Sequence, residues 1–244
     1  MFDSVLLGIL LTKGMLNSSI YFFDDTFILS STTILIHTMI AKAKPAEQWI
    51  REGGQSPLAA FVNYVHPIGE EATQYINENT FPLQVQRGEY LLKAGELCSH
   101  IYFIRKGVIR GFIREGAKEV TTWITAENEM VSSIRGFTLQ EPSLENIQTI
   151  EHCDLIVASY ETLQYLYENF IEMNVVGRKL LEQYYRDAEE RAYISRIPNA
   201  GKRYRHFLET KTELSNRIPL KYIASYLGMT IETLSRIRSK QIRS

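Results

Sequence analysis

The segment Leu220–Ile237 carries the residue spacing that most narrows the folds open to this chain. Apolar residues stand at its fourth, eighth, tenth, fifteenth and eighteenth positions, with a small residue fifth and a glycine ninth. The glycine, Gly228, fits a tight turn, because a residue without Cβ adopts a positive φ at little cost. This spacing predicts a helix-turn-helix, the motif whose second helix enters the major groove of DNA. An ordinary helical hairpin is the alternative.

The second helix of this motif offers polar side chains suited to reading bases. Thr230 is placed to cap the helix, while Leu234 and Ile237 are placed to hold it on the first helix. Glu232 and Arg236 are one turn apart, so arginine could donate to guanine and glutamate could accept from cytosine. The alternative is an ion pair on a solvated helix face. The predicted DNA contacts are Thr230, Ile231, Glu232, Thr233, Ser235, Arg236, Arg238 and Lys240.

Positive charge is concentrated in the part of the chain that holds this motif. The whole chain has 27 Lys and Arg against 28 Asp and Glu, a net charge of −1. Residues 196–244 hold eleven Lys and Arg against three Asp and Glu, a net of +8, which leaves −9 for the rest. This asymmetry is typical of an acidic module joined to one that meets phosphates. A solvated basic tail would lack the apolar helical spacing found here.

Cysteine and histidine usage argues against a disulfide framework, a metal site or a catalytic centre. The two cysteines, Cys98 and Cys153, form no CxxC pair and are typical of a reducing cytoplasm. No nucleophile–base pair or phosphate-binding loop is evident, so we expect no enzyme. The histidines are scattered without metal-ligand spacing: His37, His66, His100, His152 and His206.

The N-terminal stretch does not resemble the rest of the sequence. Val5–Leu11 is apolar but too short to span a bilayer, and Asp24 and Asp25 interrupt the next apolar stretch. A signal peptide is disfavoured, because Asp3 stands where basic residues are expected. We therefore expect a cytoplasmic protein without membrane association. Our hypothesis is that residues 1–38 are not native or are disordered, with Met39 as the true initiator.

The middle of the chain changes from helical to strand periodicity. Residues 57–77 read as two helices separated by a Pro67–Gly69 break. From Phe81 the apolar period becomes two, in short glycine-punctuated runs rich in β-branched and aromatic residues. Residues 114–118 are expected to form a hairpin turn. Strands this short and regular favour a small barrel or sandwich over βαβ units.

A long helix is predicted from about Ile171 to Ser195, after a short helix that ends at Asn169. At 1.5 Å per residue it spans roughly 37 Å, more than a small barrel needs for cover. We interpret it as a dimerisation seam; a helix packed only on its own barrel is the alternative. Residues 197–201 are expected to form a hinge, with a basic helix opening at Lys202.

Three segments together resemble the Crp/Fnr family of bacterial transcription regulators. They are RGEYLLKAGE at 87–96, IYFIRKGVIRGF at 101–112 and TIETLSRI at 230–237. The resemblance covers roughly residues 57–240. It implies an α+β fold, with a jelly-roll-like N-terminal β-roll and flanking helices, a long dimerisation helix, and a small C-terminal helix-turn-helix domain. The expected division is a poorly defined extension at 1–56, a cyclic-nucleotide-binding-like sensor at 57–160, the dimerisation helix region at 161–197 and the DNA-binding domain at 198–244.

The resemblance also implies partners. It predicts a homodimer that binds double-stranded DNA, with RNA polymerase and a small-molecule effector as further partners. Glu232 and Arg236 match two base-reading positions of the family. Ile231 stands where relatives often carry arginine, and could contact a thymine methyl group. The alternative function is a regulatory or interaction module with a cyclic-nucleotide-binding-like domain and no DNA binding.

Two departures from the family pattern limit what can be transferred. Ser143, Leu144 and Glu145 stand where members that bind cyclic AMP carry arginine, a hydroxyl residue and alanine. Glu145 has the wrong charge for a phosphate, although Arg135 could be displaced into that role. We therefore expect no cyclic AMP, identify no cofactor, and leave the effector open. After Lys240 too few residues remain for the β-hairpin wing of relatives, so phosphate contacts must come from elsewhere.

Overall fold

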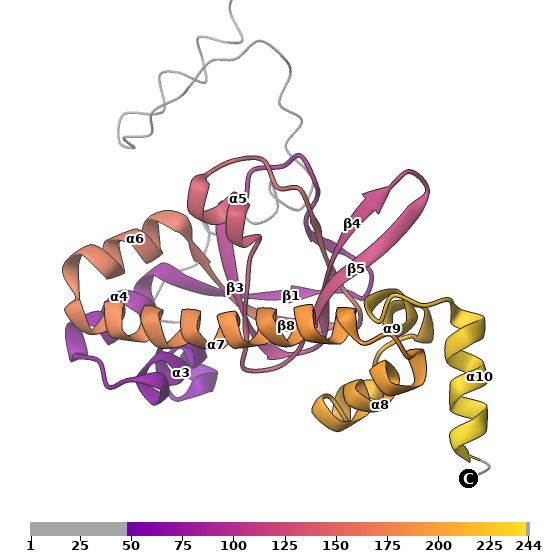
Figure 1. The fold of residues 1–244 in the computed structure, drawn as a ribbon. Coiled ribbons are helices and arrows are strands. Elements are labelled where there is room, and N and C mark those ends of the chain that lie inside the picture. The colour runs from indigo at the N-terminus through magenta and orange to yellow at the C-terminus, as the bar shows by residue number, and fades with distance from the viewer. Residues whose placement is uncertain (1–47, 243–244) are drawn as a thin grey trace, which may run out of the picture.

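The computed structural model describes residues 48–242 (Figure 1). The expectations for residues 1–38, for Met39 as initiator and for His37 lie outside the described residues. These residues begin with helical segments, continue through eight strands and one intervening helix, and finish in helices. The first segments are η1 (Ile50–Glu52), α3 (Pro57–Val65) and α4 (Glu70–Asn79).

The eight strands form two four-stranded antiparallel sheets that enclose one apolar core. Their orders are β1-β8-β3-β6 and β2-β7-β4-β5. Leu83, Tyr102, Ile147 and Leu155 are buried between the sheets. The strands are β1 (Thr80–Val85), β2 (Tyr90–Leu92), β3 (His100–Lys106), β4 (Ile109–Glu115), β5 (Lys118–Thr125), β6 (Met130–Val131), β7 (Asn146–Thr149) and β8 (Cys153–Ser159).

The hairpin predicted at residues 114–118 joins β4 to β5. Glu115 pairs with Lys118, which leaves Gly116 and Ala117 as the two turn residues. Gly116 has φ +59°, the left-handed conformation that such a hairpin turn requires. A short helix, α5 (Ile134–Leu139), lies between β6 and β7. Sequence periodicity did not predict α5, because six residues that include Gly136 show no helical apolar repeat.

The long helix predicted from Ile171 to Ser195 is α7 (Ile171–Arg196) and follows α6 (Tyr160–Asn169). Figure 1 shows α7 running along the roll from α6 toward the C-terminal helices. Its first half packs with α3 on one sheet, where Met173 and Val176 share a core with Phe103 and Ile156. Further along, the Tyr184 hydroxyl accepts a hydrogen bond from the Met130 amide at 2.7 Å. These contacts fix α7 against the roll.

The C-terminal helices form a third core. They are α8 (Ala200–Thr210), η2 (Glu213–Asn216), α9 (Leu220–Tyr226) and α10 (Ile231–Ile242). The expectation that α8 opens at Lys202 was wrong by two residues, because the Asn199 side chain accepts from the Lys202 amide at 3.0 Å and caps a helix that begins at Ala200. The predicted fold class, an α+β protein with a β-roll, a long helix and a small C-terminal helical domain, is confirmed.

Candidate nucleic-acid interface and ligand cavity

The turn between α9 and α10 has the conformation that its sequence predicts. Gly228 has φ +63°, and a Cβ placed there would meet no atom within 4 Å. The Met229 amide donates back to the Ala224 carbonyl at 2.9 Å, which closes the end of α9. The Thr230 hydroxyl accepts from the Thr233 amide at 3.2 Å, so Thr230 caps α10.

One face of α10 is locked into the core of the C-terminal domain. Leu234 is completely buried and packs in one cluster with Ile223, Ala224 and Leu227 of the first helix and its end. Ile237 is half-buried against the same cluster. The residues predicted to join the two helices therefore do so, which fixes the direction of the remaining side chains of α10.

The opposite face of α10 carries the predicted DNA contacts. Ile231 is 45% exposed. Thr233 and Arg238 are half-buried at its margins. Figure 1 shows α10 at the far end of the molecule, beyond the end of α7. The remaining predicted contacts are exposed: Thr230, Glu232, Ser235, Arg236 and Lys240.

Glu232 and Arg236 are exposed without bonding to each other. In α7 the same spacing produces an ion pair, in which Arg178 and Glu182 lie 2.6 Å apart, but no such pair joins Glu232 to Arg236 within residues 48–242. Instead, hydrogen bonding to its own backbone N–H, then to the Thr230 hydroxyl, lowers the pKa of the Glu232 carboxyl. The Glu232 carboxylate therefore also provides a hydrogen-bond acceptor for the free backbone N–H at the start of α10, a role that sequence spacing did not reveal.

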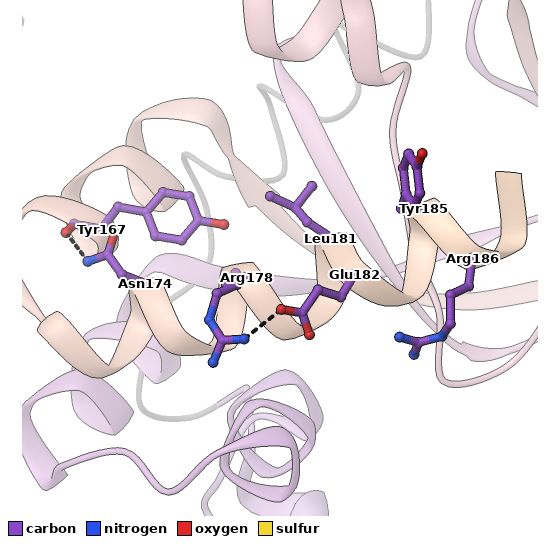
Figure 2. Close-up of a pocket in the computed structure, with 8 residues that line it drawn as sticks. Tyr167, Asn174, Arg178, Leu181, Glu182, Tyr185 and Arg186 are labelled. Atoms are coloured by element: carbon purple, nitrogen blue, oxygen red, sulfur yellow. Dashed lines mark hydrogen bonds and ion pairs between the residues drawn. The ribbon is translucent and has the colours of Figure 1, made fainter. Parts of the chain in front are cut away.

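An open groove of about 810 Å³ follows α7 (Figure 2). Leu181 and Tyr185 point to one side of the helix there, and are 60% and 74% exposed. Gly177 leaves room for the Tyr167 ring, because a Cβ at that position would lie 2.8 Å from the ring. The groove is lined by Tyr167, Asn174, Gly177, Arg178, Leu181, Glu182, Tyr185 and Arg186.

A second cavity, of about 800 Å³, lies where the roll, α7 and the C-terminal domain meet. The roll contributes Trp123 and Glu145, α7 contributes Tyr184 and Arg191, and α9 contributes Tyr226. The cavity thus touches both the sheet core and the first helix of the helix-turn-helix. It also brings together four carboxylates against two basic side chains, namely Glu129, Glu145, Asp187 and Glu190 against Arg191 and Lys211.

The segment that we expect to replace a cyclic-nucleotide cassette forms hydrogen bonds within the chain. The Trp123 indole donates to the Glu145 carboxylate at 2.8 Å. Burial raises the pKa of the Glu145 carboxyl, which the Trp123 bond partly opposes. The Ser143 hydroxyl donates to the Ser133 hydroxyl at 3.0 Å. The exposed side chain of Arg135 bonds to Glu141 at 3.2 Å and does not line the cavity.

The described residues form neither a membrane-spanning helix nor a metal-ligand cluster. In the described part of the chain, no helix is long and apolar enough to cross a membrane. Over the same residues, no three His, Cys, Asp or Glu side chains come together in a way that could hold a metal ion. Cys98 and Cys153 are both free and buried.

Comparison with known proteins relates the roll, and about two thirds of the chain, to bacterial regulators. The sequence family described as Cyclic nucleotide-binding domain matches residues 82–170. The Fumarate and nitrate reduction regulatory protein of Vibrio cholerae is 26% identical over 171 residues, 63% of this chain and 65% of that protein. The Anaerobic regulatory protein of Haemophilus influenzae is 27% identical over 164 residues, 63% of each chain. The matches thus span just under two thirds of these relatives.

Solved structures show the same fold. A putative transcriptional regulator of the Crp/Fnr family from Eubacterium rectale superposes with a TM-score of 0.61 at 16% identity, over 75% of this chain and 88% of that one. FixK2 from Bradyrhizobium japonicum superposes with a TM-score of 0.58 at 15% identity, over 66% of this chain and 83% of that one. The family match, the relatives and the fold together relate this chain to regulators of the Crp/Fnr type.

Proposed function

We propose that this chain is a dimeric, sequence-specific DNA-binding regulator of transcription, whose roll responds to an effector other than cyclic AMP. The observation that carries the proposal is the face of α10: Glu232 and Arg236 are exposed, lie one turn apart and are not paired with each other. Polar side chains held in this way by a buried opposite face are what a recognition helix requires.

The side chains of α10 divide into base-reading and phosphate-binding groups. Arg236 can donate two hydrogen bonds to guanine, and Glu232 can accept from cytosine. Ile231, 45% exposed, offers an apolar surface to a thymine methyl group. Thr230, Thr233 and Ser235 add hydroxyl groups at the same surface. Arg238 and Lys240 lie in the last turns of α10 and supply the sequence-independent phosphate contacts.

The exposed groove of α7 is proposed as the dimer seam. Leu181 and Tyr185 place apolar side chains in solvent at positions four residues apart, which is the spacing of one helix stripe. A second copy of α7 would cover both side chains and generate two-fold symmetry. Two recognition helices related in this way read half-sites about 34 Å apart, one turn of DNA.

The cavity between the roll, α7 and α9 is proposed as the effector site. A molecule bound there would contact the sheet core and Tyr226 of the DNA-binding domain together, so its binding could alter the DNA-binding domain. Glu145 opposes an anionic phosphate in this cavity. RNA polymerase remains a proposed partner, on the strength of the family relationship.

The test is selection of binding sites by the purified full chain from a randomised duplex library at physiological salt. We expect an enriched palindrome whose half-sites are about 10 base pairs apart, recovered by the unmodified chain but not by R236A. Recovery of no motif, with no salt-dependent binding to any duplex, would instead favour an interaction module that does not bind DNA.

A further inference from the structure

The first helix of the helix-turn-helix is docked on the edge of the β-roll. Figure 1 shows α9 beside the base of β4 and β5, and α9 contacts β5 directly. Because β5 is the last strand of its sheet, its outer backbone groups are free for such a contact. The Ser225 hydroxyl of α9 accepts from the Thr121 amide at 2.9 Å and donates to the Glu119 carbonyl at 3.2 Å. The Ser225 hydroxyl thus makes two hydrogen bonds to the edge of β5 that a neighbouring strand would otherwise make.

A buried arginine crosses the same junction. Arg110 of β4 is 2% exposed, and its guanidinium carbon lies 3.9 Å from the ring centre of Phe112 and 3.8 Å from that of Tyr222. The guanidinium also donates to Glu119 at 2.6 Å and to Gln148 at 2.6 and 3.1 Å. Tyr222 belongs to α9, so the DNA-binding domain supplies one of the two rings that enclose this cation.

A second arginine joins the two parts of the molecule, this time reaching from the C-terminal domain to the roll. Arg217, just before α9, donates to the two Glu127 oxygens at 2.8 and 2.6 Å, and it also bonds to Glu151. Glu127 is held in place by the Gly107 amide, which donates to it at 2.8 Å. Both carboxylates belong to loops of the roll, so Arg217 ties the start of the helix-turn-helix to two separate loops.

Apolar contacts close the rest of the junction. Val108, Ile124 and Ile150 of the roll are buried in one cluster with Ile218 and Ile223 of the C-terminal domain. Releasing the domain would therefore expose apolar surface and leave the Arg110 cation without one of its rings. Only residues 197–199 separate α7 from α8, and Ile194 of α7 packs in the same cluster. The roll and the end of α7 together therefore set the orientation of α10.

We infer that Arg110 and Arg217 are positioning residues that set the spacing of the DNA half-sites this chain accepts, although neither lies on the recognition face. This inference rests on the proposed function, because a dimer that reads two half-sites must hold its two recognition helices at a fixed separation. The α7 seam fixes the two rolls relative to each other, and the two arginines fix each helix-turn-helix relative to its own roll.

The test measures spacing preference rather than affinity alone. Full-length R217Q and Y222L remove one partner from each contact; Y222L leaves Arg110 with Phe112, Glu119 and Gln148, which avoids an unpaired buried cation. R114Q is the matched control, since Arg114 bonds to Glu119 at 3.3 Å but lies 58% exposed on the hairpin. Each protein is titrated with the selected palindrome, with versions one and two base pairs longer between half-sites, and with an isolated half-site.

The original chain and R114Q are expected to lose at least about tenfold in affinity when the spacing changes, because simultaneous engagement of both half-sites fails. For R217Q and Y222L we expect that difference to shrink to about threefold or less. Their isolated half-site affinity should stay unchanged, which also shows that the variants fold. If the R217Q/Y222L double variant kept the full spacing preference, the inference would be wrong while the proposed function would stand. If the original chain selects no palindrome, the proposed function fails and the inference fails with it.

Discussion

The indole nitrogen of Trp123 lies 2.8 Å from the Glu145 carboxylate, to which it donates a hydrogen bond. Gly111 on the neighbouring strand makes room for this arrangement, because a Cβ there would lie 2.1 Å from the indole ring. The pair lies in the segment where the family resemblance leads us to expect a phosphate site in members that bind cyclic AMP. The roll thus matches the cyclic nucleotide-binding domain family while carrying a hydrogen-bonded carboxylate where we expect the phosphate.

Cyclic AMP is therefore expected not to bind. Its phosphate would meet the Glu145 carboxylate, which has no ion-pair partner among the described residues. Isothermal titration of the full chain should show no saturable heat at ligand concentrations up to about 1 mM, the range of weak binding. A saturable signal that E145Q leaves unchanged would show that Glu145 does not guard the site.

Replacing an apolar side chain of the α7 groove with a charged one should break the dimer. Leu181 is 60% exposed, and L181R would bring a charge into a seam that excludes water. L139R is the matched control, because Leu139 is similarly exposed at 57% but lies on α5. Light scattering after size exclusion should give a dimer for the original chain and L139R, and a monomer for L181R. A dimer in all three would exclude the groove as the seam.

Base reading by Arg236 and phosphate binding by Lys240 should have different signatures. R236A should cost about 1–3 kcal/mol on the selected operator and relax specificity at one base pair. K240A should weaken all sequences alike and reduce the salt slope by about 1. R135A, which removes an equal charge from the remote helix α5, controls for net charge. Equal losses on specific and unrelated duplexes for R236A would contradict its role as a base contact.

Local patterns predicted the parts of this molecule that local residues determine. The apolar repeats that include Leu227 and Leu234, and the hairpin turn at residues 114–118, depend on near neighbours, so the sequence pattern predicted them. The start of α8 was missed because its cap, Asn199, lies inside a stretch that read as a hinge. Short α5 carries too few residues for a detectable period.

The junction between the roll and the helix-turn-helix could not be predicted from spacing. Arg217 and Glu127 are 90 residues apart, and the pair forms only because the folded roll brings a loop to the start of α9. Arg110 reads as one more polar residue in an alternating strand, yet tertiary packing encloses it between Phe112 and Tyr222. Partners this distant in sequence leave no periodic signal.

The turn of the helix-turn-helix should depend on backbone conformation rather than on space. Gly228 has φ +63°, and no atom lies within 4 Å of where a Cβ would sit. G228V should lower the free energy of unfolding by about 1–3 kcal/mol, because β-branched residues are strained at positive φ. G228N should cost less, since asparagine tolerates this conformation. Urea titration measures both; equal losses for Val and Asn would point to a different cause.

The Arg217–Glu127 contact should make stability depend on pH in the acid range. Hydrogen bonding to Arg217 lowers the pKa of Glu127 from 4.5 to about 2. A carboxyl whose pKa is lower in the folded state stabilises fully above its unfolded pKa, and the contribution is lost as pH falls toward the folded value. E127Q should therefore lower the free energy of unfolding by about 1–3 kcal/mol near pH 6, with the difference shrinking between about pH 4.5 and 2. E115Q, at the exposed end of β4, is the control and should show no such dependence. Urea unfolding at pH 6, 4 and 3 measures the difference, and a gap that stays constant from pH 6 to 3 would contradict the ionic contribution of Glu127.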